Sequence, residues 1–122
     1  MFIVPDTSIW VDHLRHGESL LVSRLESNLV AIHRFVIGEL ACGNLRARQE
    51  ILTLLQALPR IKSATDDELL WFIERHQLMG KGIGWVDAHL LAATAMDGNA
   101  KLWTRDKRLY ELAAQLNLAA VL

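Results

Sequence analysis

Cysteine is nearly absent from this sequence, which contains only Cys42 among its 122 residues. A single cysteine excludes an internal disulfide and any zinc site built on cysteine pairs. Because Cys42 lies in an apolar run, we expect a buried thiol in a reducing cytoplasm. No apolar run approaches the roughly 18 residues that a membrane span needs, and the first residues lack the pattern of a secretory signal. We therefore expect a cytoplasmic protein with no membrane segment.

A surplus of positive charge is also missing, because 13 lysines and arginines face 14 aspartates and glutamates and the net charge is −1. Nucleic-acid-binding domains often carry a basic surplus, so the overall charge does not by itself indicate such a partner. The balance of charge on the rest of the surface changes if four of the acids are gathered in one metal site. The surface around that site would then be mildly basic.

The sequence contains no internal repeat, low-complexity tract or linker, and 52% of its residues are hydrophobic. This length and composition are typical of one domain with a substantial core, here residues 1–122. Short apolar segments alternate with segments of helical periodicity, which predicts βαβ units and a parallel sheet in an α/β fold. Strands are expected at residues 2–4, 30–32, 61–63, 101–103 and 119–122. Helices are expected at residues 9–14, 18–29, 35–43, 45–58, 66–78, 85–96 and 106–116.

Two local signals refine this order of elements. Thr65 precedes Glu68 by three residues, which predicts a capping box at the start of a helix. Gly80, Gly82 and Gly84 resemble a phosphate-binding loop, but their spacing matches neither the Walker loop nor the dinucleotide fingerprint. We interpret these glycines as a flexible entry into the helix that follows them.

Asp6 follows the first strand, which is apolar without alternation and ends at Pro5. Such a strand is usually buried on both faces, as in the middle of a parallel sheet. Asp6 would then lie at the carboxyl end of the strand, where open α/β sheets bind their ligands. The alternative is that Asp6 only caps the helix after it.

Glu39 is the only charged residue between Arg34 and Arg46, in a segment whose apolar residues predict a buried helix. A buried carboxylate costs several kcal/mol unless it is paired or bound to a cation. The alternative to a cation site is a buried salt bridge to Arg34 or Arg46.

Asp87 and Asp106 complete a set of four acids. Asp87 is the only acid between residues 83 and 96, and Asp106 follows a strand and opens the last helix. Each could be explained singly as a helix cap or a favourable charge near a helix start. Together with Asp6 and Glu39 they fit one site, because the carboxyl ends of parallel strands meet at one edge of a sheet. A hard cation such as Mg²⁺ or Mn²⁺ would relieve their repulsion, which points to metal-assisted phosphodiester hydrolysis.

The segments around these acids closely resemble those of the PIN-domain ribonucleases, and within them the VapC toxins of bacterial toxin–antitoxin pairs. The resemblance covers nearly the whole chain and departs from the family at Pro5, where an apolar residue is usual. It is carried by the segments VPDTSIW at residues 4–10, FVIGELA at 35–41, GIGWVDAHLLA at 82–92 and LWTRDKRL at 102–109.

The resemblance implies a three-layer α/β/α, Rossmann-like fold around a central parallel sheet of about four to five short strands. It implies Mg²⁺ or Mn²⁺ bound by the four acids, with Ser8 and Thr104 as supporting residues. It further implies cleavage of structured RNA, often transfer or ribosomal RNA. The implied partners are a second copy of the chain and a VapB-like antitoxin, which together form a larger hetero-oligomer.

Basic residues near the acids are candidate phosphate contacts, and the alternative is an exposed helix start. They are Lys81, Arg105, Lys107 and Arg108. His89 lies two residues after Asp87, on a different helical face, and we expect it to pack or to lie on the surface. Two other function classes are a catalytically silent interaction module with the same fold and a phosphoryl-receiver domain. A receiver needs paired acids after its first strand, whereas Asp6 stands alone.

Overall fold

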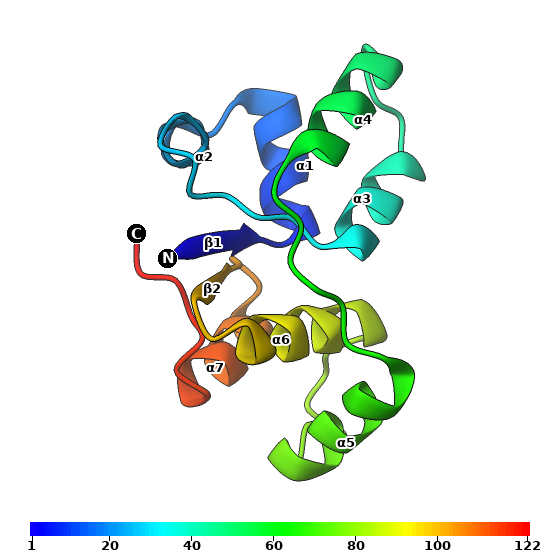
Figure 1. Cartoon of the computed structure of the whole chain (residues 1–122), viewed down its shortest axis with the longest axis vertical. Helices are drawn as coiled ribbons and strands as arrows, with labels where there is room; N and C mark the ends of the chain where they lie inside the picture. The colour runs from blue at the N-terminus through cyan, green and yellow to red at the C-terminus, as the bar shows by residue number, and fades with distance from the viewer.

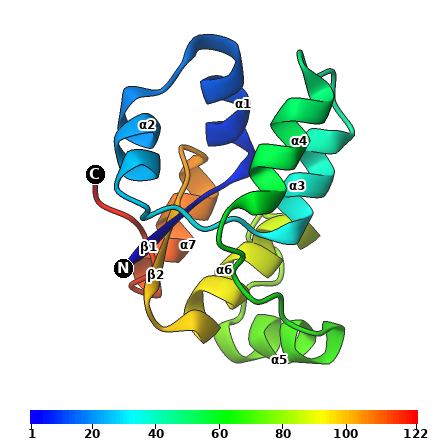
Figure 2. The same ribbon diagram turned by 45° about the horizontal axis from the view of Figure 1, so that its top comes forward.

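The computed structural model describes residues 1–122 and contains seven helices and two strands. The strands are β1 (Phe2–Pro5) and β2 (Ala100–Trp103). The helices are α1 (Thr7–His16), α2 (Ser19–Glu26), α3 (Arg34–Ala41), α4 (Arg48–Ala57), α5 (Asp66–His76), α6 (Trp85–Asp97) and α7 (Lys107–Gln115). Helices α1 to α4 lie on one side of the strand pair and α5 to α7 on the other (Figure 1). In a second view α1 and α2 again lie above the strands and α5 and α6 below them, while α7 lies behind the strands (Figure 2).

Strands β1 and β2 are parallel, with Phe2 opposite Ala100 and Pro5 opposite Trp103. Pro5 is the last residue of β1, as its missing N–H donor predicts. Because the two strands run in the same direction, the residues that follow them lie at the same edge of the sheet. This geometry brings residues about 100 positions apart to one place.

The expected sheet of four to five strands is only partly formed. Three further segments pair through isolated parallel bridges, which join Ile3 to Val30, Ile32 to Arg60 and Leu102 to Ala119. Each bridge carries two backbone hydrogen bonds and does not extend into a ladder. The segment at residues 30–32 is too short to form a longer ladder of hydrogen bonds. Asn28 before it has a left-handed backbone conformation, and the cap of α3 at His33 ends it.

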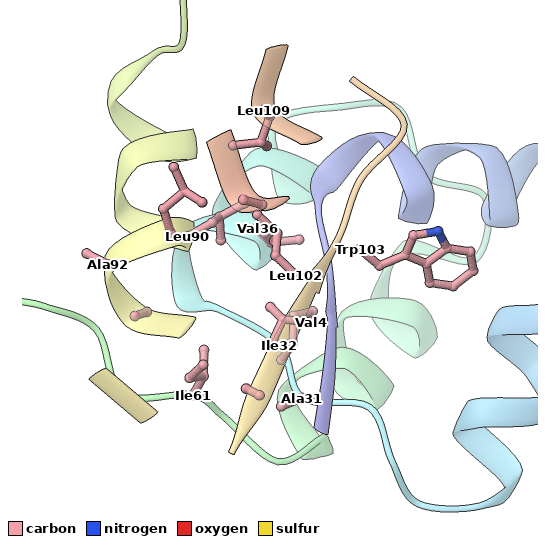
Figure 3. Close-up of a cluster of buried hydrophobic side chains, with 14 of the residues drawn as sticks. Val4, Ala31, Ile32, Val36, Ile61, Leu90, Ala92, Leu102, Trp103 and Leu109 are labelled. Atoms are coloured by element: carbon pink, nitrogen blue, oxygen red, sulfur yellow. The ribbon is translucent and has the colours of Figure 1, made fainter. Parts of the chain in front are cut away.

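The core surrounds the strands and α6. Figure 3 shows Val4 and Leu102 of the two strands at the centre of this cluster, with Leu90 of α6 and Val36 of α3 close by. Helix α6 is the most buried helix, since every residue from 88 to 94 is buried. This confirms the prediction that the apolar run after Trp85 forms an interior helix. No helix of the structure is both long enough and apolar enough to cross a membrane.

The capping box predicted at the start of α5 is present, whereas the burial predicted at the end of α3 is not. The capping box of α5 is confirmed, because Thr65 N–H donates to Glu68 Oε1 at 2.8 Å and Glu68 N–H donates to Thr65 Oγ1 at 3.1 Å. Helix α3, by contrast, buries only Val36 and Leu40. The expected burial of Cys42 is therefore wrong, and its thiol is exposed. The reason is that α3 packs against α1 and α4 along one stripe and leaves its opposite face to solvent.

Candidate functional site

Asp6 lies directly after β1 and is 5% exposed. It caps α1, because its Oδ1 accepts a hydrogen bond from Ile9 N–H at 3.1 Å, and the Ser8 hydroxyl donates to the same oxygen at 2.6 Å. The capping alternative is thus true but incomplete, since Thr104 Oγ1 donates to Asp6 Oδ2 from the end of the other strand. With both oxygens engaged, the carboxylate has a fixed orientation at the sheet edge.

Thr104 joins two of the four acids. Its hydroxyl donates to Asp6 and accepts a hydrogen bond from Asp106 N–H at 3.0 Å. Asp106 caps α7 through its Oδ1, which accepts from Leu109 N–H at 2.9 Å. The side chain of Thr104 is buried, while Asp106 is exposed and presents its second oxygen without a hydrogen bond. The parallel strand pair therefore places Asp6, Thr104 and Asp106 at one edge.

Glu39 reaches this edge from α3. Its Oε1 accepts a hydrogen bond from Thr7 Oγ1 at 2.5 Å, which ties it to the residue after Asp6. The expected burial of Glu39 is wrong, because it lies on the exposed side of α3. It also forms no salt bridge with Arg34 or Arg46, since Arg105 makes both ion pairs of the structure.

Thr7 is a site residue that sequence reasoning missed. It belongs to the polar turn of residues 6–8, in which Asp6 and Ser8 were singled out and Thr7 was not. The available signal was its position between those two residues. Its partner Glu39 lies 32 positions along the chain, so no local pattern identifies the contact.

Asp87 lies in the first turn of α6 and is partly buried. Its pKa is raised to about 6, first by burial and then by the negative charges of Asp6, Asp106 and Glu39, in that order. All four acids therefore share one electrostatic field. No lysine, arginine or histidine forms an ion pair with any of them.

The donor set suits a hard divalent cation. Carboxylate oxygens are the ligands that Mg²⁺ and Mn²⁺ prefer. No three acidic, histidine or cysteine side chains already form a closed coordination group. Mg²⁺ does not need one, because it usually binds through one or two carboxylates and retains several waters. The unpaired carboxylates and the raised pKa of Asp87 fit such an ion.

The basic candidates differ in what they contact. The Arg105 guanidinium forms ion pairs with Asp12, at 3.1 Å, and with Glu18, and it lies 5.6 Å from the centre of the Trp103 ring. It thereby links the turn after β2 to α1 and to the residue before α2. The other three are exposed and form no ion pair: Lys81, Lys107 and Arg108.

Two buried histidines lie close to each other, one at the N-cap of α3 and one in α6. His33 and His89 are almost fully buried, which confirms that His89 packs, and their rings are 5.9 Å apart. His33 caps α3, because its Nδ1 accepts from Phe35 N–H at 3.0 Å. Burial, together with nearby positive charge from His89 and Arg34, lowers the pKa of His33 to about 4. Burial also lowers the pKa of His89, so both rings are neutral near pH 7.

Comparison with known proteins agrees with this fold. The family model described as the PIN domain matches residues 3–115, and the chain belongs to this family. It is 43% identical over 117 residues to Ribonuclease VapC32 of Mycobacterium tuberculosis, in strains CDC 1551 / Oshkosh and ATCC 25618 / H37Rv. These alignments cover 96% of this chain and 94% of each relative. The resemblance to VapC toxins is therefore confirmed over nearly the full length.

Proposed function

We propose that this chain is the endoribonuclease toxin of a toxin–antitoxin pair and hydrolyses phosphodiester bonds in structured RNA, such as transfer or ribosomal RNA, in a bacterial cytoplasm. The observation that carries the proposal is the set of four carboxylates without a basic partner, in which Asp87 has a pKa raised to about 6. Uncompensated acids are costly in a fold unless a cation binds them. The 43% identity to a named ribonuclease supports the same activity.

Asp6, Glu39, Asp87 and Asp106 would hold Mg²⁺ or Mn²⁺ in this proposal. When bound, the cation supplies a more acidic water and stabilises the charge that develops on the phosphate. The remaining roles belong to the fixed side chains around it.

Hydrogen bonds prepare the site for this chemistry. Ser8, Thr104 and the N–H of Ile9 fix the Asp6 carboxylate, so it needs little reorganisation when substrate arrives. Thr7 orients Glu39 through one oxygen. The second oxygen of Glu39 remains available to a ligand.

Substrate RNA would approach over the exposed basic residues near the acids. Lys81, Lys107 and Arg108 carry free positive charge and suit phosphate contacts. Arg105 differs, because its two ion pairs compete with a phosphate for the guanidinium. We therefore assign the phosphate contacts first to the other three.

Partners would cover apolar surface that the folded chain leaves open. Trp71 is 63% exposed, and Leu54 and Leu70 are more than half exposed. Leu70 and Trp71 are adjacent on α5, whereas Leu54 lies on α4. Exposed apolar surface of this kind is typical of protein–protein contacts. We propose a homodimer and a VapB-like antitoxin that blocks the site, assembled into a larger complex.

The test is cleavage of total cellular RNA by purified, antitoxin-free protein with Mg²⁺, with Mn²⁺ and with EDTA. We expect discrete fragments that vanish with EDTA and fall by roughly 100-fold or more in Asp6→Asn and Glu39→Gln, a loss of about 2.7 kcal/mol of transition-state stabilisation. Matched controls are Asp67→Asn and Glu74→Gln, which change the same groups on the exposed surface of α5. The controls should cleave like the wild type.

Two results would contradict the proposal. Wild-type cleavage rates in Asp6→Asn would show that the acid cluster is not the catalytic site. Folded protein that cleaves no RNA with either metal would favour the catalytically silent interaction module instead.

A further inference from the structure

A cleft of about 530 Å³ opens beside Glu39 between α1, α3 and α4. Its walls come from the end of α1, the end of α3 and the turn at residues 43–46. Glu39 lines the cleft and also accepts the hydrogen bond from Thr7, which follows Asp6. The cleft therefore adjoins one member of the acid cluster.

The cleft is basic apart from Glu39. Arg15, His16 and Arg46 line it, and no other acid does. Arg15 and Arg46 form no ion pair. The nearby Arg48 is less available to a ligand. Its guanidinium donates to backbone carbonyls at the end of α3, including that of Gly43 at 3.2 Å. Two free guanidinium groups beside a hydrolytic site suit a polyanion.

The floor of the cleft is apolar, with Leu14, Leu40 and Ile51, and the amide of Asn44 lies at its wall. Unpaired RNA bases stack on aromatic side chains or guanidinium planes and form hydrogen bonds through their edges, and bases flipped into a pocket also pack against apolar side chains. The guanidinium groups of Arg15 and Arg46 and the apolar residues offer such faces here. A volume of this size is typical of a small-ligand pocket, so it accepts a nucleotide and not a duplex.

A second cleft differs from the first in the chemistry of its lining residues. It measures about 270 Å³ and is almost wholly apolar, with Trp10, Leu25 and Leu58 among its lining residues. His13 is the only polar residue that lines it. It offers no fixed positive charge to a phosphate, so the observations favour RNA in the first cleft alone.

We propose that the first cleft holds an unpaired nucleotide adjacent to the scissile phosphate. Arg15 and Arg46 contact its phosphates, the apolar floor receives its base and Asn44 contacts the base edge. This rests on the ribonuclease function proposed above and adds where the substrate strand leaves the acid cluster.

The test compares Arg15→Ala and Arg46→Ala with Arg75→Ala, which removes the same charge from the exposed surface of α5. We expect each cleft variant to raise KM for the cleaved RNA roughly tenfold with kcat little changed, as for a lost charged hydrogen bond. Binding of a short, mixed-sequence single-stranded RNA is measured in the Asp6→Asn background. There, the slope of log Kd against log salt should fall by about 0.7 for each lost phosphate contact.

Asn44→Ala provides an independent readout. It should change which base lies next to the cut, measured by sequencing the fragment ends, without changing the salt slope. Thermal melts check that every variant is folded.

The proposal is overturned if the two cleft variants match Arg75→Ala in both KM and salt slope. It is also overturned if they lose binding of a protein partner while RNA binding is unchanged. Absence of cleavage by the wild type would instead refute the ribonuclease function, and the binding assay would still decide whether the cleft holds RNA.

Discussion

Replacing Asp87 with asparagine should stabilise the metal-free protein at neutral pH while abolishing cleavage. Asp87 stands among three other acids, and burial with their charges raises its pKa from 3.8 to about 6. In the unfolded chain this carboxyl loses its proton near pH 4, and in the folded chain it does so near pH 6. Between these values the folded state binds more protons, so its stability falls as pH rises.

The size of the effect follows from the shift. Two pKa units correspond to about 3 kcal/mol, which is an upper limit for the cost of the charged carboxylate above about pH 7. For a chain of this length that energy corresponds to an increase in Tm of up to roughly 10 °C in Asp87→Asn. Asparagine has almost the same shape, so packing changes contribute little.

The assay is thermal unfolding in EDTA near pH 4.5 and near pH 7.5, with Asp67→Asn on the exposed surface of α5 as the control. The gain in Tm for Asp87→Asn should appear at the higher pH and largely disappear at the lower one. Taking the difference between variant and wild type cancels other titrating groups, such as His33. Mn²⁺ should then raise Tm more in the wild type than in the variant. If Asp87→Asn were no more stable than the wild type near pH 7.5, burial and the charges of the other three acids would not destabilise the Asp87 carboxylate.

Three further predictions concern the surroundings of the site. Thr104→Val should cost about 1–3 kcal/mol in urea unfolding and slow cleavage without weakening RNA binding, because Asp6 loses a buried hydrogen bond. Gly82→Ala should cost about 1 kcal/mol or more in urea unfolding, because residue 82 has φ +83° and a Cβ there would lie 2.6 Å from Arg108 Nη1. Unfolding should also become easier as pH falls from about 6.5 towards 4, because unfolded His33 binds a proton that its folded form, with a pKa of about 4, does not. His33→Asn, which retains a capping side chain, should weaken that pH dependence.

Patterns within short segments predicted much of this protein. The apolar strand before Asp6 and the strand before Asp106 indicated parallel pairing, which alone brings these two acids together. The buried helix around Leu90 was evident from its apolar residues. These features follow from burial and periodicity, which act on neighbouring residues and can be recognised without knowing the rest of the fold.

Contacts between distant segments depended on the tertiary structure. Glu39 is exposed and bonded to Thr7, although its apolar neighbours predicted burial, because the way α3 packs decides which side of the helix faces solvent. Arg105 is engaged by Asp12 and Glu18, 93 and 87 positions away, although its place beside Asp106 suggested a free phosphate contact.

The sequence by itself therefore indicated the four candidate acids, their order and the α/β class of the fold. Only the tertiary structure decided which side chains orient those acids, how their charges raise the pKa of Asp87, and that a basic cleft adjoins Glu39. The physical reason is that strand and helix patterns are local. Hydrogen bonds, charge interactions and clefts depend instead on distances between elements, which are set when the whole chain packs.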